Sequence, residues 1–357
     1  MEKAYLVLSN GAVFEGERFG AVADTVGELV FTTGMGGYIE TLTDPSYTGQ
    51  MILQTFPMIG NYGIIPEDFE GKPAALGYVV REWCDAPSNF RCAGDLDRFL
   101  KEHNIPGICG VDTREITRMI REHGVMNAAI CDRVPEDFTA IKAYRVTDAV
   151  ASVSCRSAEK HTAETEKFSV VLINYGAKAN IQKELLRRGC SVTVVPFDTS
   201  AVEILALRPD GIMLSNGPGD PADTVDCIRQ LSLLMGKVPM FGICLGHQLL
   251  ALANGGKTVK LKYGHRGVNQ PVTDTKTGRT YMTSQNHGYA VVSESLPETA
   301  RVSFLNANDQ TCEGVEYPKG KAFSVQFHPE ARSGPLDTSF LFDRFIAMME
   351  ESRNAAL

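Results

Sequence analysis

A cysteine that could act as a nucleophile stands between two glycines in residues 242–246, Gly-Ile-Cys-Leu-Gly. A strand-like apolar run, 238–243, precedes Cys244, and a helix-like run, 245–253, follows it. This is the order of a nucleophile elbow, in which glycines avoid a side-chain collision at the sharp turn from strand to helix. The amino end of the helix would favour the thiolate form of the cysteine. The five residues alone are equally compatible with a buried structural cysteine.

A histidine and a glutamate that could serve this cysteine lie far downstream. Residues 323–330 read Phe-Ser-Val-Gln-Phe-His-Pro-Glu, a strand-like run that ends in His328 and Glu330. Residues i and i+2 of an extended segment point the same way, and the intervening proline keeps the histidine extended. Glu330 can therefore orient the His328 ring while the other ring nitrogen faces Cys244. The two motifs together predict a Cys-His-Glu triad for acyl transfer from an amide.

A glycine-containing loop could stabilise the oxyanion that acyl transfer creates. Residues 212–215 read as a strand, and residues 216–221, Asn-Gly-Pro-Gly-Asp-Pro, follow them. In an elbow one oxyanion donor is the N–H after the nucleophile, here Leu245, and Gly219 is the candidate for the second. By itself the loop is more typical of an ordinary Gly-Pro turn.

The composition is typical of a globular chain with two domains. The 357 residues are 43% apolar and 22% charged, which is enough apolar material for two cores. The net charge of −8 includes no basic stripe, which argues against a nucleic-acid partner. No signal peptide and no apolar run of membrane-spanning length is evident. The 9 cysteines show no zinc-ligand spacing, so no metal site is expected, and their scatter favours a reducing, cytoplasmic location.

The segment 155–167 has no Val, Ile, Leu, Met or Phe and is predicted to link two domains, 1–154 and 168–357. The first domain has short strand-like runs followed by helical periodicity, which predicts an α+β or mostly β domain of unspecified topology. The second alternates strands and helices, which predicts an α/β fold: a doubly wound, mostly parallel sheet with the candidate residues at strand carboxyl ends. Short strands are expected over 258–328, and a closing helix over 339–351.

A helix is also predicted over 112–123, with Asp112 as its N-cap and its end before Gly124. Most other histidines are expected to take no part in the chemistry. His247 follows the nucleophile without a carboxylate to orient it, so it is interpreted as structural. The role of His287 stays open. The histidines expected at the surface are His103, His123, His161 and His265.

The motifs around Cys244, His328 and Glu330, together with the loop 215–221, resemble the class I (triad) glutamine amidotransferases over roughly residues 168–355. The resemblance implies that the amide is glutamine. Carried over by position, it implies a glutamine pocket made of Ser46, Gly217, Gly219, Leu245, Gln248, Asn286, Gly288 and Tyr289. Because Ser46 belongs to the first domain, the active site would lie at the domain interface. The role of Lys178 stays open.

Residues 43–50, 60–63 and 110–118 are similar to the small subunit of carbamoyl phosphate synthetase, so the resemblance covers nearly the whole chain. It implies a glutamine-hydrolysing carbamoyl-phosphate synthase, a ligase, whose first domain binds the partner. Ammonia would pass to a large synthetase subunit, where bicarbonate, ATP and Mg²⁺ give carbamoyl phosphate for arginine and pyrimidine synthesis. No cofactor is implied for this chain, which lacks a G-x-x-x-x-G-K-[ST] phosphate loop.

Two other functions use the same residues. One is a stand-alone cysteine hydrolase of glutamyl compounds, which would leave the first domain without a purpose. The other is a non-catalytic, amidotransferase-like regulatory subunit, against which the intact Cys244, His328 and Glu330 argue.

Overall fold

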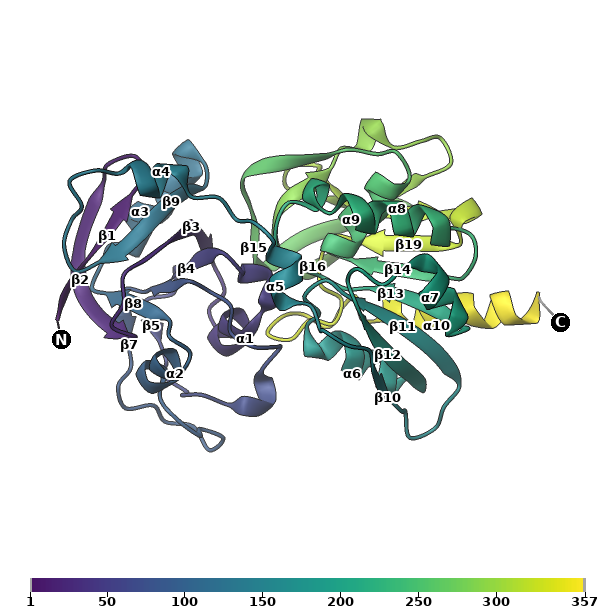
Figure 1. The fold of residues 1–357 in the computed structure, drawn as a ribbon, viewed down its shortest axis with the longest axis horizontal. Helices are drawn as coiled ribbons and strands as arrows, with labels where there is room; N and C mark the ends of the chain where they lie inside the picture. Colours follow the sequence, from purple (N-terminus) through teal and green to yellow (C-terminus); the bar gives the residue numbers. More distant parts are fainter. Residues whose placement is uncertain (1, 356–357) are drawn as a thin grey trace. The chain divides into compact units, whose positions relative to one another are not determined.

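The computed structural model describes residues 2–355, and the chain divides between Ala149 and Val150 into two compact units, called unit 1 and unit 2 (Figure 1). The segment 155–167, which the sequence predicts as a linker, belongs to unit 2. There β10 (Glu159–His161) pairs antiparallel with β12 (Cys190–Pro196). No helix within 2–355 is long and apolar enough to cross a membrane.

Unit 1 contains a closed β-barrel. Its elements are β1 (Lys3–Leu8), β2 (Val13–Gly20), β3 (Thr25–Thr32), α1 (Tyr38–Thr43), η1 (Pro45–Tyr47), β4 (Gln50–Gln54), β5 (Met58–Ile59), η2 (Pro66–Asp68), β6 (Gly77–Val79), β7 (Glu82–Trp83), α2 (Leu96–Glu102), β8 (Pro106–Cys109), α3 (Thr113–His123), β9 (Met126–Cys131) and α4 (Thr139–Ala143). The barrel order is β1-β2-β8-β6-β4-β3-β9. Pairing of β1 with β9, from opposite ends of the unit, closes the barrel, and no local pattern could predict that pairing.

Helix α3 begins and ends where the sequence predicts. The Asp112 side chain accepts hydrogen bonds from the backbone N–H groups of Arg114 and Glu115, at 3.1 and 3.0 Å. These are donors that a helix start leaves without partners. Gly124, with φ 93°, ends the helix in a backbone conformation that other residues rarely adopt.

Unit 2 is organised around one long mixed sheet. Its elements are α5 (Ala149–Val153, at the division), β10, β11 (Phe168–Asn174), α6 (Ala179–Arg187), β12, α7 (Ala201–Ala206), β13 (Gly211–Leu214), η3 (Pro221–Asp223), α8 (Val225–Leu234), β14 (Met240–Ile243), α9 (Leu245–Ala253), β15 (Thr258–Asp274), β16 (Thr280–Val291), η4 (Ser293–Ser295), β17 (Arg301–Asn306), β18 (Cys312–Tyr317), η5 (Pro318–Gly320), β19 (Ala322–Val325) and α10 (Phe340–Asn354). In the described residues the sheet order is β10-β12-β11-β13-β14-β19-β18-β16-β15-β17.

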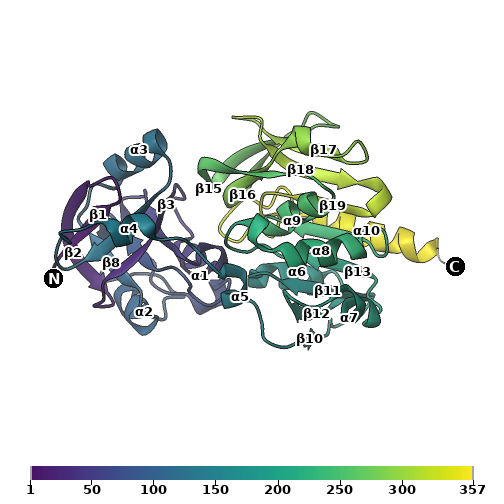
Figure 2. The same cartoon turned by 45° about the horizontal axis from the view of Figure 1, so that its top comes forward.

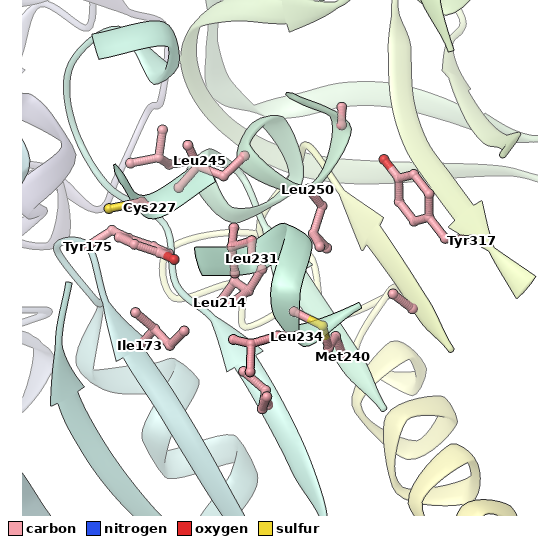
Figure 3. Packing of buried hydrophobic residues seen from close by; sticks show 14 of the residues in the cluster. Ile173, Tyr175, Leu214, Cys227, Leu231, Leu234, Met240, Leu245, Leu250 and Tyr317 are labelled. Atoms are coloured by element: carbon pink, nitrogen blue, oxygen red, sulfur yellow. The ribbon is translucent and has the colours of Figure 1, made fainter. Parts of the chain in front are cut away.

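Helices cover both faces of the parallel centre of this sheet, which runs from β12 to β19 (Figures 1 and 2). Because successive strand residues point to opposite faces, β11 sends Ile173 to one apolar cluster and Leu172 to the other. The first cluster includes Leu231 of α8 and Leu250 of α9 (Figure 3), and the second includes residues of α6 and α10. The helices on both faces fit the predicted α/β fold.

The prediction of a mostly parallel sheet with short strands over 258–328 is wrong for one half of the sheet. From β19 outward the pairings are antiparallel, and β15 and β16 form a long hairpin of 17 and 12 residues. Register shifts interrupt the hairpin between Lys260 and His265 and between Gly267 and Gln270. These irregularities break the alternation of side chains, so a sequence pattern divides one long strand into several short ones.

Candidate active site

Cys244 lies at the turn between β14 and α9 in a strained backbone conformation. Its φ of 51° and ψ of −102° lie in a region that side-chain-bearing residues rarely enter. A hydrogen bond from its N–H to the Val325 carbonyl, at 2.9 Å, holds the turn. The strained turn after a buried strand is the nucleophile-elbow geometry that the sequence predicts.

The two glycines of the elbow avoid two different collisions. A Cβ on Gly242 would lie 2.7 Å from the Gly246 carbonyl oxygen, whereas a Cβ on Gly246 would lie 2.6 Å from the Leu214 carbonyl oxygen. Leu214 ends β13, which pairs with β14. The second glycine is therefore required by close packing of α9 against the neighbouring strand as well as by the turn.

The sheet brings His328 to Cys244. Because β14 pairs in parallel with β19, with Ile243 opposite Val325, the residues after both strands emerge at the same edge. His328 is anchored there by a hydrogen bond from its N–H to the Ser284 carbonyl, at 2.9 Å. Its Nδ1 lies 2.7 Å from Glu330 Oε1. Its buried Nε2 makes no hydrogen bond of regular geometry within residues 2–355. The nearby Cys244 thiol nevertheless helps to raise the pKa of His328.

Electrostatics favour a charged His328–Glu330 pair. Burial by itself lowers the pKa of His328, but the Glu330 carboxylate outweighs burial and raises that pKa from 6.5 to about 10. Burial also opposes the charge of Glu330, yet Lys178 and His328 lower the pKa of that carboxyl from 4.5 to about 2. An imidazolium beside a carboxylate can hold a neighbouring thiolate and then donate a proton to a leaving group.

Asn286 and Gln248 of the predicted glutamine pocket contact Cys244. The Cys244 thiol donates to the Asn286 carbonyl, with sulfur and oxygen 3.7 Å apart. Gln248, on the first turns of α9, donates from Nε2 to the Tyr289 carbonyl and to Gln326 Oε1, both at 2.9 Å. These bonds connect the elbow helix with β16 and with the segment that precedes His328. Gln326 was not predicted from the sequence, although it stands only two residues before His328, in the segment that follows β19.

The glycine loop after β13 reaches the start of α9. A Cβ on Gly217 would lie 2.8 Å from a methyl carbon of Leu245, and Gly219 has a φ of 88° that favours glycine. Leu245 is the first residue of α9, where backbone N–H groups have no acceptor within the helix. Gly288 lies in β16, where a Cβ would be 3.3 Å from the Arg266 guanidinium.

Ser46 belongs to unit 1. It lies buried in η1, and its backbone N–H donates to Asp44 Oδ1 at 2.9 Å. Its place in a glutamine pocket stays a prediction.

Lys178 is a functional candidate whose role the sequence left open. Its Nζ lies 3.1 Å from Glu330 Oε1, and both side chains are buried. Its backbone N–H donates to Asn216 Oδ1 at 3.0 Å, and the Asn180 side chain donates to the Glu330 carbonyl. Lys178 follows the carboxyl end of β11, a position in a parallel sheet that could have indicated its involvement.

The remaining histidines differ from one another in burial. His103 and His123 are exposed, as the sequence predicts. The buried His247 points Nδ1 at the Ser324 hydroxyl, 2.9 Å away, and burial lowers its pKa from 6.5 to about 3. The prediction of a surface position is wrong for His265, whose side chain is only 11% exposed. It stands opposite His287 in the β15–β16 pairing.

The chain matches the models of two protein families. Residues 171–348 match the family model of glutamine amidotransferase class-I, and residues 6–130 match that of the carbamoyl-phosphate synthase small chain, CPSase domain. The chain is 49% identical to the carbamoyl phosphate synthase small chain of Oceanobacillus iheyensis, with 99% of this chain and 98% of that one covered. It is 48% identical to that of Lactococcus lactis (98% and 99% covered) and 50% identical to that of Staphylococcus epidermidis (98% and 97%). The chain belongs to the carbamoyl phosphate synthase small chain family.

Proposed function

We propose that this chain is the glutaminase subunit of a glutamine-hydrolysing carbamoyl phosphate synthase, with Cys244, His328 and Glu330 as its catalytic residues. The observation that carries the proposal is a cysteine in a strained strand-to-helix turn, adjacent to a histidine that a buried carboxylate keeps charged. A merely structural cysteine does not require this backbone strain.

The reaction proceeds in two halves. The Cys244 thiolate attacks the side-chain amide carbon of glutamine, and the N–H groups of Gly219 and Leu245 stabilise the oxyanion. The His328 imidazolium gives its proton to the departing ammonia, leaving a cysteinyl thioester. His328 then takes a proton from water, the hydroxide attacks the thioester, and glutamate leaves as the thiol is restored. Each oxyanion donor lowers such a barrier by about 2.7–4 kcal/mol.

The glutamine pocket is proposed to use both backbone and side-chain groups. The Gln248 side chain donates to the Tyr289 carbonyl, and the Asn286 carbonyl accepts from the Cys244 thiol. Gly217 and Gly288 complete the proposed pocket. Ser46 is included on the strength of the resemblance alone.

The product ammonia is proposed to pass to a large synthetase subunit that uses bicarbonate, ATP and Mg²⁺, with unit 1 serving to bind that partner. Membership of the small-chain family supports this. The cytoplasm is the proposed location, and the 9 free thiols are compatible with a reducing compartment.

The test is Cys244→Ser in the complex with the large subunit. Glutamine-dependent synthesis of carbamoyl phosphate should disappear while ammonia-dependent synthesis survives, because only the amide cleavage needs the thiol. Cys155→Ser, at a half-buried thiol outside the elbow, is the matched control and should retain both activities. If Cys244→Ser removed both activities, the cysteine would be structural.

The two rival functions have distinct outcomes. A stand-alone hydrolase would turn over glutamine as fast without the large subunit as with it. A non-catalytic subunit would leave Cys244 unlabelled by a glutamine-like electrophile that alkylates thiolates.

A further inference from the structure

A second group of titratable side chains lies within unit 2 and has no part in the proposed reaction. His265 of β15, His287 of β16 and Glu313 of β18 approach one another so that one donor atom from each lies within 4.8 Å of the others. Their side chains are 11%, 2% and 0% exposed. The three residues are called the His-His-Glu cluster below.

The hydrogen bonds at the outer side of each ring place a lone pair on the inner side. His287 Nδ1 lies 2.7 Å from the Tyr289 carbonyl, which can only accept, so this nitrogen donates. His265 Nε2 lies 2.8 Å from Asp309 Oδ2 and donates in the same way. In a neutral imidazole the other nitrogen is then an acceptor. Neutral rings therefore direct His287 Nε2 and His265 Nδ1 towards Glu313 as acceptors, at 3.9 and 3.4 Å from its Oε1.

A glutamine amide adds a further acceptor. Gln285 Nε2 donates to Glu313 Oε2 at 3.1 Å and to Thr283 Oγ1 at 3.2 Å. The Thr283 hydroxyl donates its own hydrogen to the Gln270 carbonyl, so the amide cannot be reversed without losing both bonds. Gln285 Oε1 consequently faces His287 Nε2, 3.1 Å away.

Converging lone pairs need a positive charge among them. Within residues 2–355, His265 Nδ1 is buried and makes no hydrogen bond of regular geometry, although Glu313 Oε1 lies 3.4 Å away; an unsatisfied buried polar atom is costly. Two extra protons, one on each ring, or one divalent cation would resolve the repulsion. We propose that the His-His-Glu cluster is a divalent-cation site, best suited to Zn²⁺, with His265 Nδ1, His287 Nε2 and Glu313 Oε1 as ligands.

The chemistry of the donors favours the cation. Zinc prefers imidazole nitrogen and carboxylate oxygen at about 2.0–2.2 Å, so tetrahedral ligands lie about 3.4 Å apart. The 3.4 Å separation of His265 Nδ1 from Glu313 Oε1 meets this spacing, and Gln285 Oε1 is placed to act as a fourth ligand. Metal-bound histidines almost always donate their other N–H to a carboxylate or a carbonyl. Asp309 and the Tyr289 carbonyl supply those two acceptors.

A cation here would connect three strands next to the proposed active site. The ligands come from β15, β16 and β18. In the β15–β16 pairing His265 stands opposite His287, between the two register shifts. Asn286 lies between Gln285 and His287 in β16, and its carbonyl accepts from the Cys244 thiol. The cation is therefore structural, and it holds the strand that borders the nucleophile.

The test is a metal titration of the purified full-length chain in a Cys244→Ser background, which removes the thiol beside His328 as a competing ligand. After dialysis against a chelator, Co²⁺ is added and its visible d–d absorption recorded, and Zn²⁺ is then used to displace it. We expect one equivalent of Co²⁺ with tetrahedral bands and without thiolate charge-transfer absorption. Affinity should fall at least tenfold in Glu313→Gln and in His265→Gln, and about 10–100-fold in Asp309→Asn.

Matched controls separate the cluster from adventitious binding. Glu316→Gln, on the same strand β18 but paired with Arg344 at 2.6 Å, and His123→Gln, at an exposed histidine, should bind as tightly as the background. The melting temperature should rise with Zn²⁺ in the background but not in His265→Gln. The proposal is overturned if Co²⁺ does not bind or if Glu313→Gln and His265→Gln bind it unchanged, which would mean that protons occupy the cluster. If Glu313→Gln does not fold, His265→Gln and Asp309→Asn decide the matter.

Discussion

Two buried groups of histidine and carboxylate lie in unit 2 and differ in the partners of the carboxylate. Glu330 accepts from the His328 ring and faces the Lys178 ammonium, so positive charge is built into that group. Glu313 instead receives amide N–H groups from Gln285 and Asn306, and the neighbouring imidazoles, when neutral, direct acceptors towards it. We therefore propose that the same residue types serve proton transfer in one place and cation binding in the other.

The largest expected difference between the two groups is catalytic. His328→Asn should lower kcat/KM for glutamine hydrolysis about 10²- to 10⁴-fold, the usual contribution of a general acid–base residue. His265→Asn should lower it less than tenfold, because that ring contacts no reacting atom. Steady-state glutaminase assays of the complex measure both, with His123→Asn as the control. Equal losses in the two variants would erase the distinction.

The next largest effect is on stability at the charged group. Lys178→Met should reduce the free energy of unfolding by about 3–5 kcal/mol, because it leaves a buried carboxylate short of one partner. The double variant Lys178→Met/Glu330→Gln should lose less than the sum of the two single variants. Urea denaturation gives these values, and Lys183→Met, at an exposed lysine of α6, is the control. Strict additivity would show that the two charges do not interact.

A smaller effect tests the close packing that places His265 opposite His287. Gly264 and Gly278 share a φ of 71°, but a Cβ on Gly264 would lie 2.2 Å from the His287 carbonyl, whereas nothing lies within 4 Å of one on Gly278. Gly264→Ala should therefore cost about 1–3 kcal/mol more than Gly278→Ala, since both share the backbone strain and only one is overpacked. Thermal or urea unfolding of both variants provides the comparison. Similar losses would contradict the close approach.

The smallest effect concerns a buried histidine without a carboxylate. The pKa of His247 is lowered to about 3, so the unfolded chain binds a proton below pH 6.5 that the folded chain does not. Stability is thus present above pH 6.5 and is lost as the pH falls. Between pH 6.5 and 5.5 the free energy of unfolding of the wild type should fall by about 1 kcal/mol relative to His247→Gln. For His328 the sign is opposite, because its pKa is raised: its contribution is full below pH 6.5 and is lost as pH rises towards about 10.

Local patterns predicted several parts of the molecule well. Helix α9 spans Leu245–Ala253 as the sequence predicts, and Asp112 caps α3, because steric and capping requirements involve residues that are close in the chain. The ion pair of Lys178 and the burial of His265 were not predicted. Both depend on strands that are distant in sequence and paired in the sheet, and no short-range pattern records that pairing.

The sequence by itself predicted the sharp turn at Cys244, because its flanking glycines avoid collisions that larger side chains would make, and it placed His328 and Glu330 two residues apart. The tertiary structure alone decided which histidines carry a charge. A buried imidazole is charged or neutral according to the groups that face it. Those groups come from strands and loops far apart in the chain, so only the folded structure distinguishes the raised pKa of His328 from the lowered pKa of His247.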